Sequence, residues 1–249
     1  MKVLVIGDSC TDEYIYGKCE RMCPDAPVPV FVPLYQKENK GMAGNVYQNL
    51  VALGLPAVLK TNNNAVVKTR YVDEKTNHMF LRIDSGEEKI SRITDLTADF
   101  LQEFGAVVVS DYNKGFLSRE DIRFICENHS LVFVDTKKII DDFCRHCSYL
   151  KINQEEHKKS FEDIKNLSEG WITEKLIVTL GSRGCLHKGA YYSVGKVEIK
   201  DTSGAGDTFL AGLVYEYLAS GDISKAMEFA NKCATKVVQM KGVNIINDV

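Results

Sequence analysis

Short apolar segments alternate with segments of helical periodicity along this chain, and this alternation limits the fold more than any other feature. The apolar segments have the length and the β-branched content of buried strands. Strand–helix alternation predicts a mostly parallel sheet with helices on both faces and right-handed crossovers. We therefore expect an α/β sandwich of three layers. The segments predicted as its strands are Lys2–Ile6, Val107–Ser110, Leu131–Val134, Tyr149–Ile152 and Leu176–Leu180.

The helical segments carry apolar residues at spacings of three and four. Gly54 and Gly221 follow two of them, as expected at helix ends. Ser118 is a natural N-cap with acids in the turn after it. Cys185–His187 and Tyr191–Val194 read as a hairpin. The predicted helices are Ala43–Leu53, Leu96–Phe104, the segment opened by Ser118, Ala205–Ala219 and Ile223–Met240.

Polar residues collect where the predicted strands end. In an open α/β sheet, ligands bind at the carboxyl ends of the strands. We expect a site at this edge, formed in part by Asp8, Asp111, Asp135, Asn153 and Gly181.

Composition excludes several classes of protein. The 249 residues fit one domain, 1–249, and the net charge of −3 gives no sign of the basic surface typical of nucleic-acid binding. No apolar run approaches the roughly 20 residues of a membrane helix. Val3–Ile6 is too short for a secretory signal and ends before an acid, so we expect a cytoplasmic protein with no membrane partner.

The chain has eight cysteines. Cys19 and Cys23 together with Cys144 and Cys147 offer four zinc ligands. The pairs lie far apart in the sequence, however, and other cysteines lie in apolar segments where they act as small hydrophobic residues. Free thiols are the expectation.

The segment Asp201–Phe209 carries the clearest chemistry. Gly204, Ala205 and Gly206 lead directly into a helix, and their backbone N–H groups predict an anion site. An acid at this position, Asp207, would repel a phosphate unless it takes a proton from an attacking hydroxyl. The alternative is that Asp207 only favours the helix dipole. The chain has neither a Walker loop nor the protein-kinase signatures, which excludes both classes.

Asp201–Phe209 resembles the C-terminal signature of the ribokinase-like (PfkB) carbohydrate kinases. Gly7–Gly17 and Cys23–Val30 are similar to one subgroup, the D-glycero-β-D-manno-heptose-7-phosphate kinases, found alone or as the kinase half of a bifunctional ADP-heptose synthesis enzyme. Further similar segments follow in the same order: Gly41–Asn45, Val67–Arg70, Leu81–Asp84, Ser110–Gly115, Val134–Asp135 with Lys137, Asn153–Glu156 and Val178–Gly184.

The resemblance implies a sugar site. Asp12 matches an acid that binds sugar hydroxyls, although by itself it reads equally well as a turn residue. Gly41 and Asn45 match the sugar-contact loop, where glycine lets the backbone approach a ligand. Met42 departs from the family, which has a second glycine there.

The subgroup resemblance also implies basic residues that face the distal phosphate of a phosphorylated sugar. Arginine binds two phosphate oxygens with its planar fork. The alternative is a solvated basic strand face. The residues concerned are Lys68, Arg70, Arg82 and Lys114.

The nucleotide side follows from the same resemblance. Asn153 and Glu156 match an N-x-x-E element in which the acid acts through water on Mg²⁺ around the phosphates of ATP. A monovalent cation is left open as a further cofactor. The other nucleotide contacts implied are Thr179, Gly181, Gly184, Gly204, Gly206 and Asn231.

The resemblance further implies a small β-lid, built from about Glu13–Lys37 and Val67–Ser91, which closes over the sugar and pairs two subunits into a homodimer. The chain is shorter than typical members between Leu55 and Val66, where they have another helix and strand, and again near 162–171.

The reaction implied is transfer of the ATP γ-phosphoryl group to a sugar hydroxyl, with Asp207 as base. The acceptor implied is the anomeric hydroxyl of a heptose 7-phosphate. Two alternatives stay open: a kinase of the same family for another sugar, sugar phosphate or nucleoside, and a catalytically silent regulator that binds sugar or nucleotide.

Overall fold

The computed structural model describes residues 1–167 and 170–246, within which the strands form two sheets. The larger sheet has the order β12-β11-β10-β9-β8-β7-β1-β4. Neighbours from β4 to β10 are parallel, whereas the β11–β12 hairpin is antiparallel, so the predicted mostly parallel sheet is confirmed. The strands are β1 (Val3–Gly7), β4 (Ala57–Lys60), β7 (Ala106–Asp111), β8 (Val132–Thr136), β9 (Tyr149–Asn153), β10 (Leu176–Thr179), β11 (Cys185–His187) and β12 (Ala190–Tyr192).

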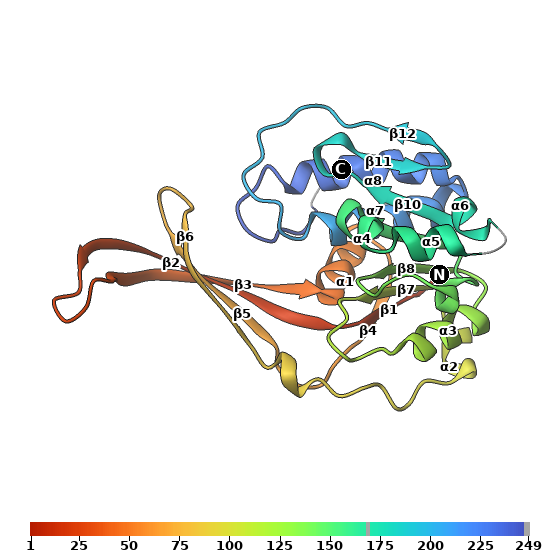
Figure 1. Cartoon of the computed structure of the whole chain (residues 1–249), viewed down its shortest axis with the longest axis horizontal. Coiled ribbons are helices and arrows are strands. Elements are labelled where there is room, and N and C mark those ends of the chain that lie inside the picture. Colours follow the sequence, from red (N-terminus) through yellow and green to blue (C-terminus); the bar gives the residue numbers. More distant parts are fainter. Residues whose placement is uncertain (168–169, 247–249) are drawn as a thin grey trace.

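Helices cover both faces of this sheet, which confirms the three layers (Figure 1). One face packs against α1 (Ala43–Ala52), α7 (Ala205–Ser220) and α8 (Ile223–Val237). The other face packs against α2 (Ala98–Gln102), α3 (Arg119–Asn128), α5 (Phe161–Asn166) and α6 (Trp171–Lys175). The short helix α4 (Gln154–Lys159) continues from the end of β9. Among the described residues, no helix is long and apolar enough to cross a membrane.

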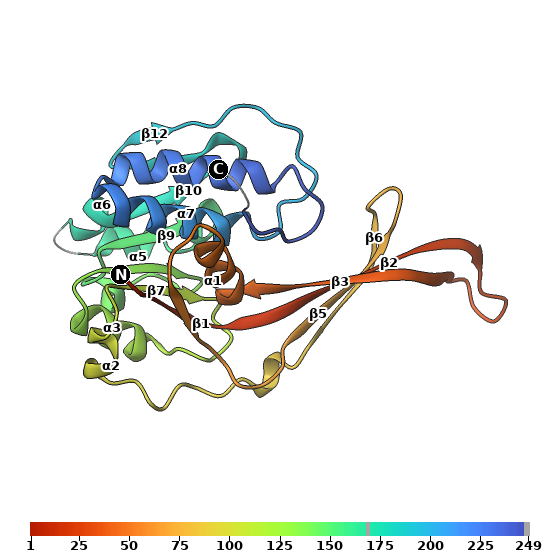
Figure 2. The ribbon, with the colours of Figure 1, turned by 180° about the vertical axis from the view of Figure 1, so that it is seen from behind.

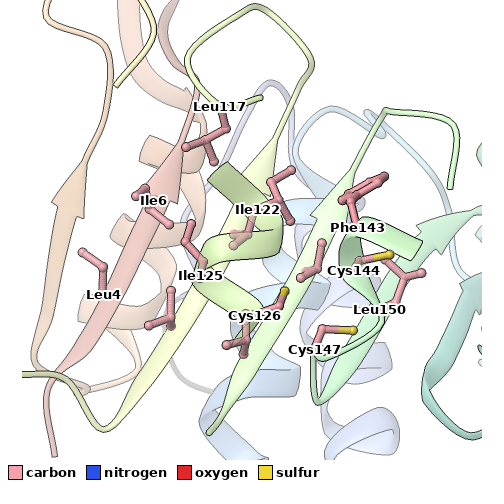
Figure 3. Close-up of a cluster of buried hydrophobic side chains, with 14 of the residues drawn as sticks. Leu4, Ile6, Leu117, Ile122, Ile125, Cys126, Phe143, Cys144, Cys147 and Leu150 are labelled. Atoms are coloured by element: carbon pink, nitrogen blue, oxygen red, sulfur yellow. The ribbon is translucent and has the colours of Figure 1, made fainter. Parts of the chain in front are cut away.

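The central strands are apolar throughout because both of their faces are covered. In β1, Leu4 and Ile6 join the core beneath α3, shown in Figure 3, whereas Val3 and Val5 join the core beneath α7. All four side chains are fully buried. Burial of each stabilises the fold by about 1.5–3 kcal/mol.

The cysteines are free thiols. Cys144 and Cys147 lie in the core beneath α3. Cys19 lies in the smaller sheet, so the two cysteine pairs considered as zinc ligands are in different parts of the fold.

The smaller sheet projects from the sandwich as a long arm (Figures 1 and 2). Its order is β3-β2-β5-β6, with β2 (Ser9–Met22), β3 (Pro29–Met42), β5 (Val67–Asp73) and β6 (Met79–Ser85). A single helical turn, η1 (Glu87–Lys89), follows β6. We call this sheet the lid, because its strands lie in and around the two segments from which a lid was expected.

Several sequence-based boundaries differ from the structure. The strand β2 was not predicted from the sequence. Its buried face carries a charged residue, Asp12, beside buried aromatic residues, so the strand lacks a continuous apolar face. The strand β4 occupies the region expected to lack a strand; it is a short, half-buried edge strand with a weak signal. The last helix ends at Val237 rather than Met240, and α2 is only one turn.

Two expectations fall partly outside the described residues. The shortened region near 162–171 contains residues 168 and 169, and the expected domain 1–249 contains residues 247–249. The helix cap predicted at Ser118 lies within the described residues and is confirmed. The Ser118 hydroxyl accepts a hydrogen bond from the Asp121 backbone N–H, and the Asp121 carboxylate accepts one from the Ser118 N–H.

Candidate active site

The carboxyl ends of the parallel strands meet at one edge, as expected, and two of their acids shape loops there. The Asp8 carboxylate accepts backbone N–H groups from Tyr112 at 2.8 Å, Lys114 at 3.3 Å and Phe116 at 3.2 Å, which fixes the loop after β7. The Asp111 carboxylate pairs with Lys138 at 2.9 Å. Asp8 and Asp111 thus fix backbone and side chains at this edge of the sheet.

Asp207 lies in the first turn of α7 and is almost fully buried. Its Oδ1 accepts a hydrogen bond from the Tyr112 hydroxyl at 2.6 Å, and its Oδ2 accepts one from the Asn45 Nδ2 at 3.1 Å. The three residues come from α7, the loop after β7 and the start of α1. The carboxylate is thus fixed by donors from two other elements.

Burial raises the pKa of Asp207 to about 6, against hydrogen bonds from Tyr112 and Asn45 that lower it. The group is therefore mostly ionised at neutral pH, yet its pKa is close to the working pH. General bases work best in that range. The alternative reading of Asp207 as a mere helix-dipole residue does not account for this burial.

Asn45, which is predicted to contact the sugar, donates its amide hydrogen bond to the Asp207 carboxylate. Its Nδ2 also lies 3.4 Å from the Gly204 carbonyl oxygen, and its Oδ1 accepts from the Asn49 Nδ2 at 2.9 Å. Gly204 has a φ of 77°, and a Cβ there would come within 2.6 Å of the Asn45 Nδ2. A side chain at position 204 would therefore collide with the Asn45 amide.

The predicted anion site lies at the start of α7. The first N–H groups of a helix have no partner within the helix and attract anions. The Ala205 N–H makes a long bond of 3.3 Å to the Thr202 oxygen. The Lys151 ammonium lies beside Gly206, 3.2 Å from where a Cβ would stand. A positive charge is thus next to the backbone amides.

Sequence reasoning missed Lys151 and Tyr112 as site residues. Lys151 is buried and pairs with Asp135 at 2.6 Å. Burial opposes its charge, but Asp135 outweighs this and raises the pKa of Lys151. A lysine inside the apolar strand β9 was a usable signal, because lysine is almost never buried unless paired. Tyr112 gave no comparable signal.

A cleft of about 900 Å³ opens beside Asp207. Its floor is formed by the ends of β9 and β10 and the start of α7, and its apolar wall includes Val194, Val197 and Phe209. The residues predicted to contact nucleotide or its metal all line this cleft: Asn153, Glu156, Thr179, Gly181, Gly184, Gly204, Gly206 and Asn231. Asn231 also donates to the Tyr192 oxygen at 2.8 Å.

Asn153 and Glu156 form a capping box at the start of α4. The Asn153 Oδ1 accepts from the Glu156 N–H at 2.9 Å, and the Glu156 Oε2 accepts from the Asn153 N–H at 2.8 Å. The remaining oxygen, Oε1, pairs with the Lys137 ammonium at 3.0 Å. Glu156 and Lys137 both line the cleft.

This donor set fits a magnesium ion that is held mainly by nucleotide phosphates and water. Mg²⁺ in such sites keeps several waters and takes few protein ligands. The described residues contain no cluster of three or more side chains able to enclose a metal ion. Action of Glu156 on Mg²⁺ through water stays a prediction.

Asp12 lies inside β2, so its interpretation as a turn residue is wrong. Its Oδ1 accepts from Arg70 at 2.6 Å, and the Arg70 guanidinium lies over the Tyr14 ring at 4.9 Å. A Cβ on Gly41 would come within 2.1 Å of the Asp12 Oδ2 and 2.6 Å of the Cys10 Sγ. Glycine at position 41 thus leaves room for the Asp12 carboxylate.

Each of the four predicted phosphate-binding cations is paired with an acid. Lys68 and Lys114 both contact Glu87, at 3.4 and 2.5 Å. Arg82 forms two hydrogen bonds to Asp84 in an exposed position. The solvated-face alternative thus suits Arg82. It does not suit Lys68 or Arg70, which are buried.

Met42 has a left-handed φ of 59° and is buried at the start of α1. Its side chain packs with Cys10 and Val66, and Tyr112 packs against the same cluster. A side chain in this conformation is strained. The Met42 side chain therefore fills space close to Tyr112.

Residues 58–248 match the family described as pfkB family carbohydrate kinase. The chain belongs to this family. Its fold is ribokinase-like. The matched residues include the whole cleft and β5, whereas β2 and β3 of the lid precede them.

A similar curated protein is the bifunctional protein HldE of Helicobacter pylori strain J99, 30% identical over 293 residues. The alignment covers 97% of this chain and 63% of HldE, so this PfkB-family chain spans less than two thirds of that relative.

Solved structures show the same fold. Ribokinase from Thermotoga maritima has a TM-score of 0.70 at 16% identity and covers 97% of this chain and 94% of its own. Arabidopsis thaliana ribokinase complexed with ribose and ATP has a TM-score of 0.69 at 16% identity, covering 96% and 93%.

Proposed function

We propose that this kinase transfers the γ-phosphoryl group of ATP to a sugar hydroxyl, with Asp207 as the catalytic base. The observation that carries the proposal is the position of Asp207, buried between the nucleotide cleft and the lid and held by Tyr112 and Asn45. The hydroxyl proton passes to the carboxylate as its oxygen attacks the γ-phosphorus. The bond from that phosphorus to the bridging oxygen breaks and releases ADP.

The rest of the site supplies charge stabilisation. The backbone of Gly204–Gly206 and the Lys151 ammonium are placed to face the equatorial oxygens of the moving group. Mg²⁺, when bound with ATP near Glu156, would neutralise charge on the phosphates. The lid would close over the sugar and exclude water, which limits ATP hydrolysis.

As acceptor we propose the anomeric hydroxyl of a heptose 7-phosphate. Two observations support this acceptor. The segments Gly7–Gly17 and Cys23–Val30 are similar to heptose-phosphate kinases, and HldE is 30% identical to this chain. The buried Lys68 and the nearby Lys114 offer positive charge for a distal phosphate.

A panel of acceptors tests this assignment. ADP release would be measured with Mg·ATP and D-glycero-β-D-manno-heptose 7-phosphate, fructose 6-phosphate, ribose or adenosine. We expect the heptose phosphate to give the highest kcat/KM. Turnover only on another acceptor would support the kinase activity and assign a different substrate. The strained Met42 favours this alternative. Nucleotide binding without turnover on any acceptor would indicate a silent regulator.

We also propose that the lid joins two copies of the chain. Its outer strands carry exposed apolar side chains, including Val32, Leu34, Leu81 and Ile83. Such side chains on a projecting sheet are typical of an interaction surface.

A further inference from the structure

Glu87 lies between the two lysines assigned above to a substrate phosphate. Its Oε2 is 2.5 Å from the Lys114 ammonium, and its Oε1 is 3.4 Å from the Lys68 ammonium. The three residues come from separate segments: η1 after β6, the strand β5, and the loop after β7. Glu87 thus joins the lid to the sandwich at the sugar end of the site.

The contact is poorly satisfied for a carboxylate. The Glu87 Oε1 is buried, and the Lys68 ammonium lies 3.4 Å from it, which is long for a charge-assisted hydrogen bond. Two ammonium groups offer up to six N–H donors and two charges. A dianion would suit Lys68 and Lys114 better than one carboxylate does.

Glu87 also lies on a short segment, η1, that can open locally. The preceding turn is tied: Gly86 has a φ of 83°, a Cβ there would meet the Ala65 oxygen at 2.2 Å, and the Asn64 Nδ2 donates to the Gly86 oxygen at 2.9 Å. Beyond it, η1 is a single turn without buried residues. Few buried contacts allow such a segment to open locally.

The other two cations on this part of the lid are held by acids of the lid sheet itself. Arg70 is paired with the buried Asp12, and Arg82 with Asp84. Lys68 and Lys114 differ, because their shared partner sits on the loosely held η1 turn. Of the four, they are the pair that an incoming anion can take over.

We propose that Glu87 is a specificity-determining residue that competes with the substrate phosphate for Lys68 and Lys114. In the empty enzyme it holds the two lysines together. A sugar with a distal phosphate dianion displaces its carboxylate, whereas an unphosphorylated sugar leaves Glu87 paired with both lysines. This inference rests on the proposed function and deepens it: acceptors are selected by the charge at the end remote from Asp207.

Glu87→Gln tests the inference by kinetics. The variant keeps the size of the side chain and removes the competing charge. We expect the KM for heptose 7-phosphate to fall about tenfold, equivalent to about 1.4 kcal/mol, with kcat and the KM for ATP within twofold of the original enzyme. Glu88→Gln changes the exposed neighbouring acid and serves as the matched control, with no expected effect. An unchanged or raised KM in Glu87→Gln would overturn the inference.

Binding of inorganic phosphate tests it without turnover. Calorimetry would be performed with the cleft saturated by a nonhydrolysable ATP analogue and Mg²⁺. We expect Glu87→Gln to bind phosphate about tenfold more tightly, and the gain to vanish when Lys114→Met is added. Equal or weaker binding by Glu87→Gln would contradict the inference. If Glu87→Gln binds phosphate more tightly but the enzyme does not turn over heptose 7-phosphate, the competition by Glu87 is supported and heptose 7-phosphate is ruled out as the acceptor.

Discussion

Asp207 combines burial with ionisation, and this has an energetic consequence. Its pKa rises from an ordinary 3.8 to about 6 in the folded protein. Ionisation of the buried group therefore destabilises the fold. The cost is absent below pH 3.8, grows up to about pH 6 and is fully present above that. About two pKa units correspond to about 3 kcal/mol.

Asp207→Asn should therefore be more stable than the original protein at pH 7.5, by about 1–3 kcal/mol. The amide carries no charge to be buried and can keep the contact with Asn45. Urea unfolding at several pH values measures the difference, which should shrink to near zero at pH 4. A variant that is less stable at pH 7.5 would show that Asp207 is needed for folding rather than for chemistry.

Tyr112 tunes the same carboxylate. Its hydroxyl bond lowers the pKa of Asp207 against the effect of burial. Tyr112→Phe removes the bond, so the pKa of Asp207 should rise and the acid limb of the kcat/KM profile should move up by about one pH unit. Tyr191→Phe, which removes the hydroxyl of an exposed tyrosine outside the cleft, is the control. A limb that stays in place or moves to lower pH would contradict this role.

The residue pairs of the site lay largely beyond sequence reasoning. The signature Asp201–Phe209 singled out Asp207 and the loop before it as the candidate base and anion site. It gave no sign that Asn45, 162 positions away, would hold the carboxylate. Glu87 sits in a run of exposed charged residues, and only the fold brings it between two lysines.

At the scale of elements, the strands buried on both faces were predictable because their sequences are continuously apolar. The capping boxes at Ser118 and Asn153 are local, and the sequence contains all of their partners. The lid was harder, since its inner face must be polar for a ligand. The parallel pairing of β2 with β5 is a long-range contact with no local signal.

The outer face of the lid supports a prediction about assembly. The strand register places Leu81 opposite Tyr71 and Ile83 opposite Thr69, on the face away from Arg70. Leu81 and Ile83 are 53% and 46% exposed. We expect the protein to sediment as a dimer and the double variant Leu81→Asp, Ile83→Asp to sediment as a monomer.

Analytical ultracentrifugation at micromolar concentrations makes this measurement, and nucleotide binding serves as the control for folding. Because the substituted face is turned away from the site, ATP affinity should not change. A monomeric original protein, or a dimeric double variant, would contradict dimerisation through this face.

In the whole molecule, the active site lies where the two sheets meet. The sandwich supplies Asp207, the amides of α7 and the cleft beside them. The lid supplies Asp12, Arg70 and Lys68. Contact between them includes Val243, near the end of the chain, which packs with Tyr14 and Val72 of the lid. Under the proposed function, acceptor and nucleotide would bind on opposite sides of Asp207.

The most direct test of the account is transfer of a labelled γ-phosphoryl group from Mg·ATP to a sugar by the purified protein and by Asp207→Asn. We predict a labelled sugar phosphate with the original protein and a rate lower by about 10³-fold with the variant, while both bind ATP equally well. Transfer at a similar rate by Asp207→Asn would contradict the assignment of Asp207 as the base.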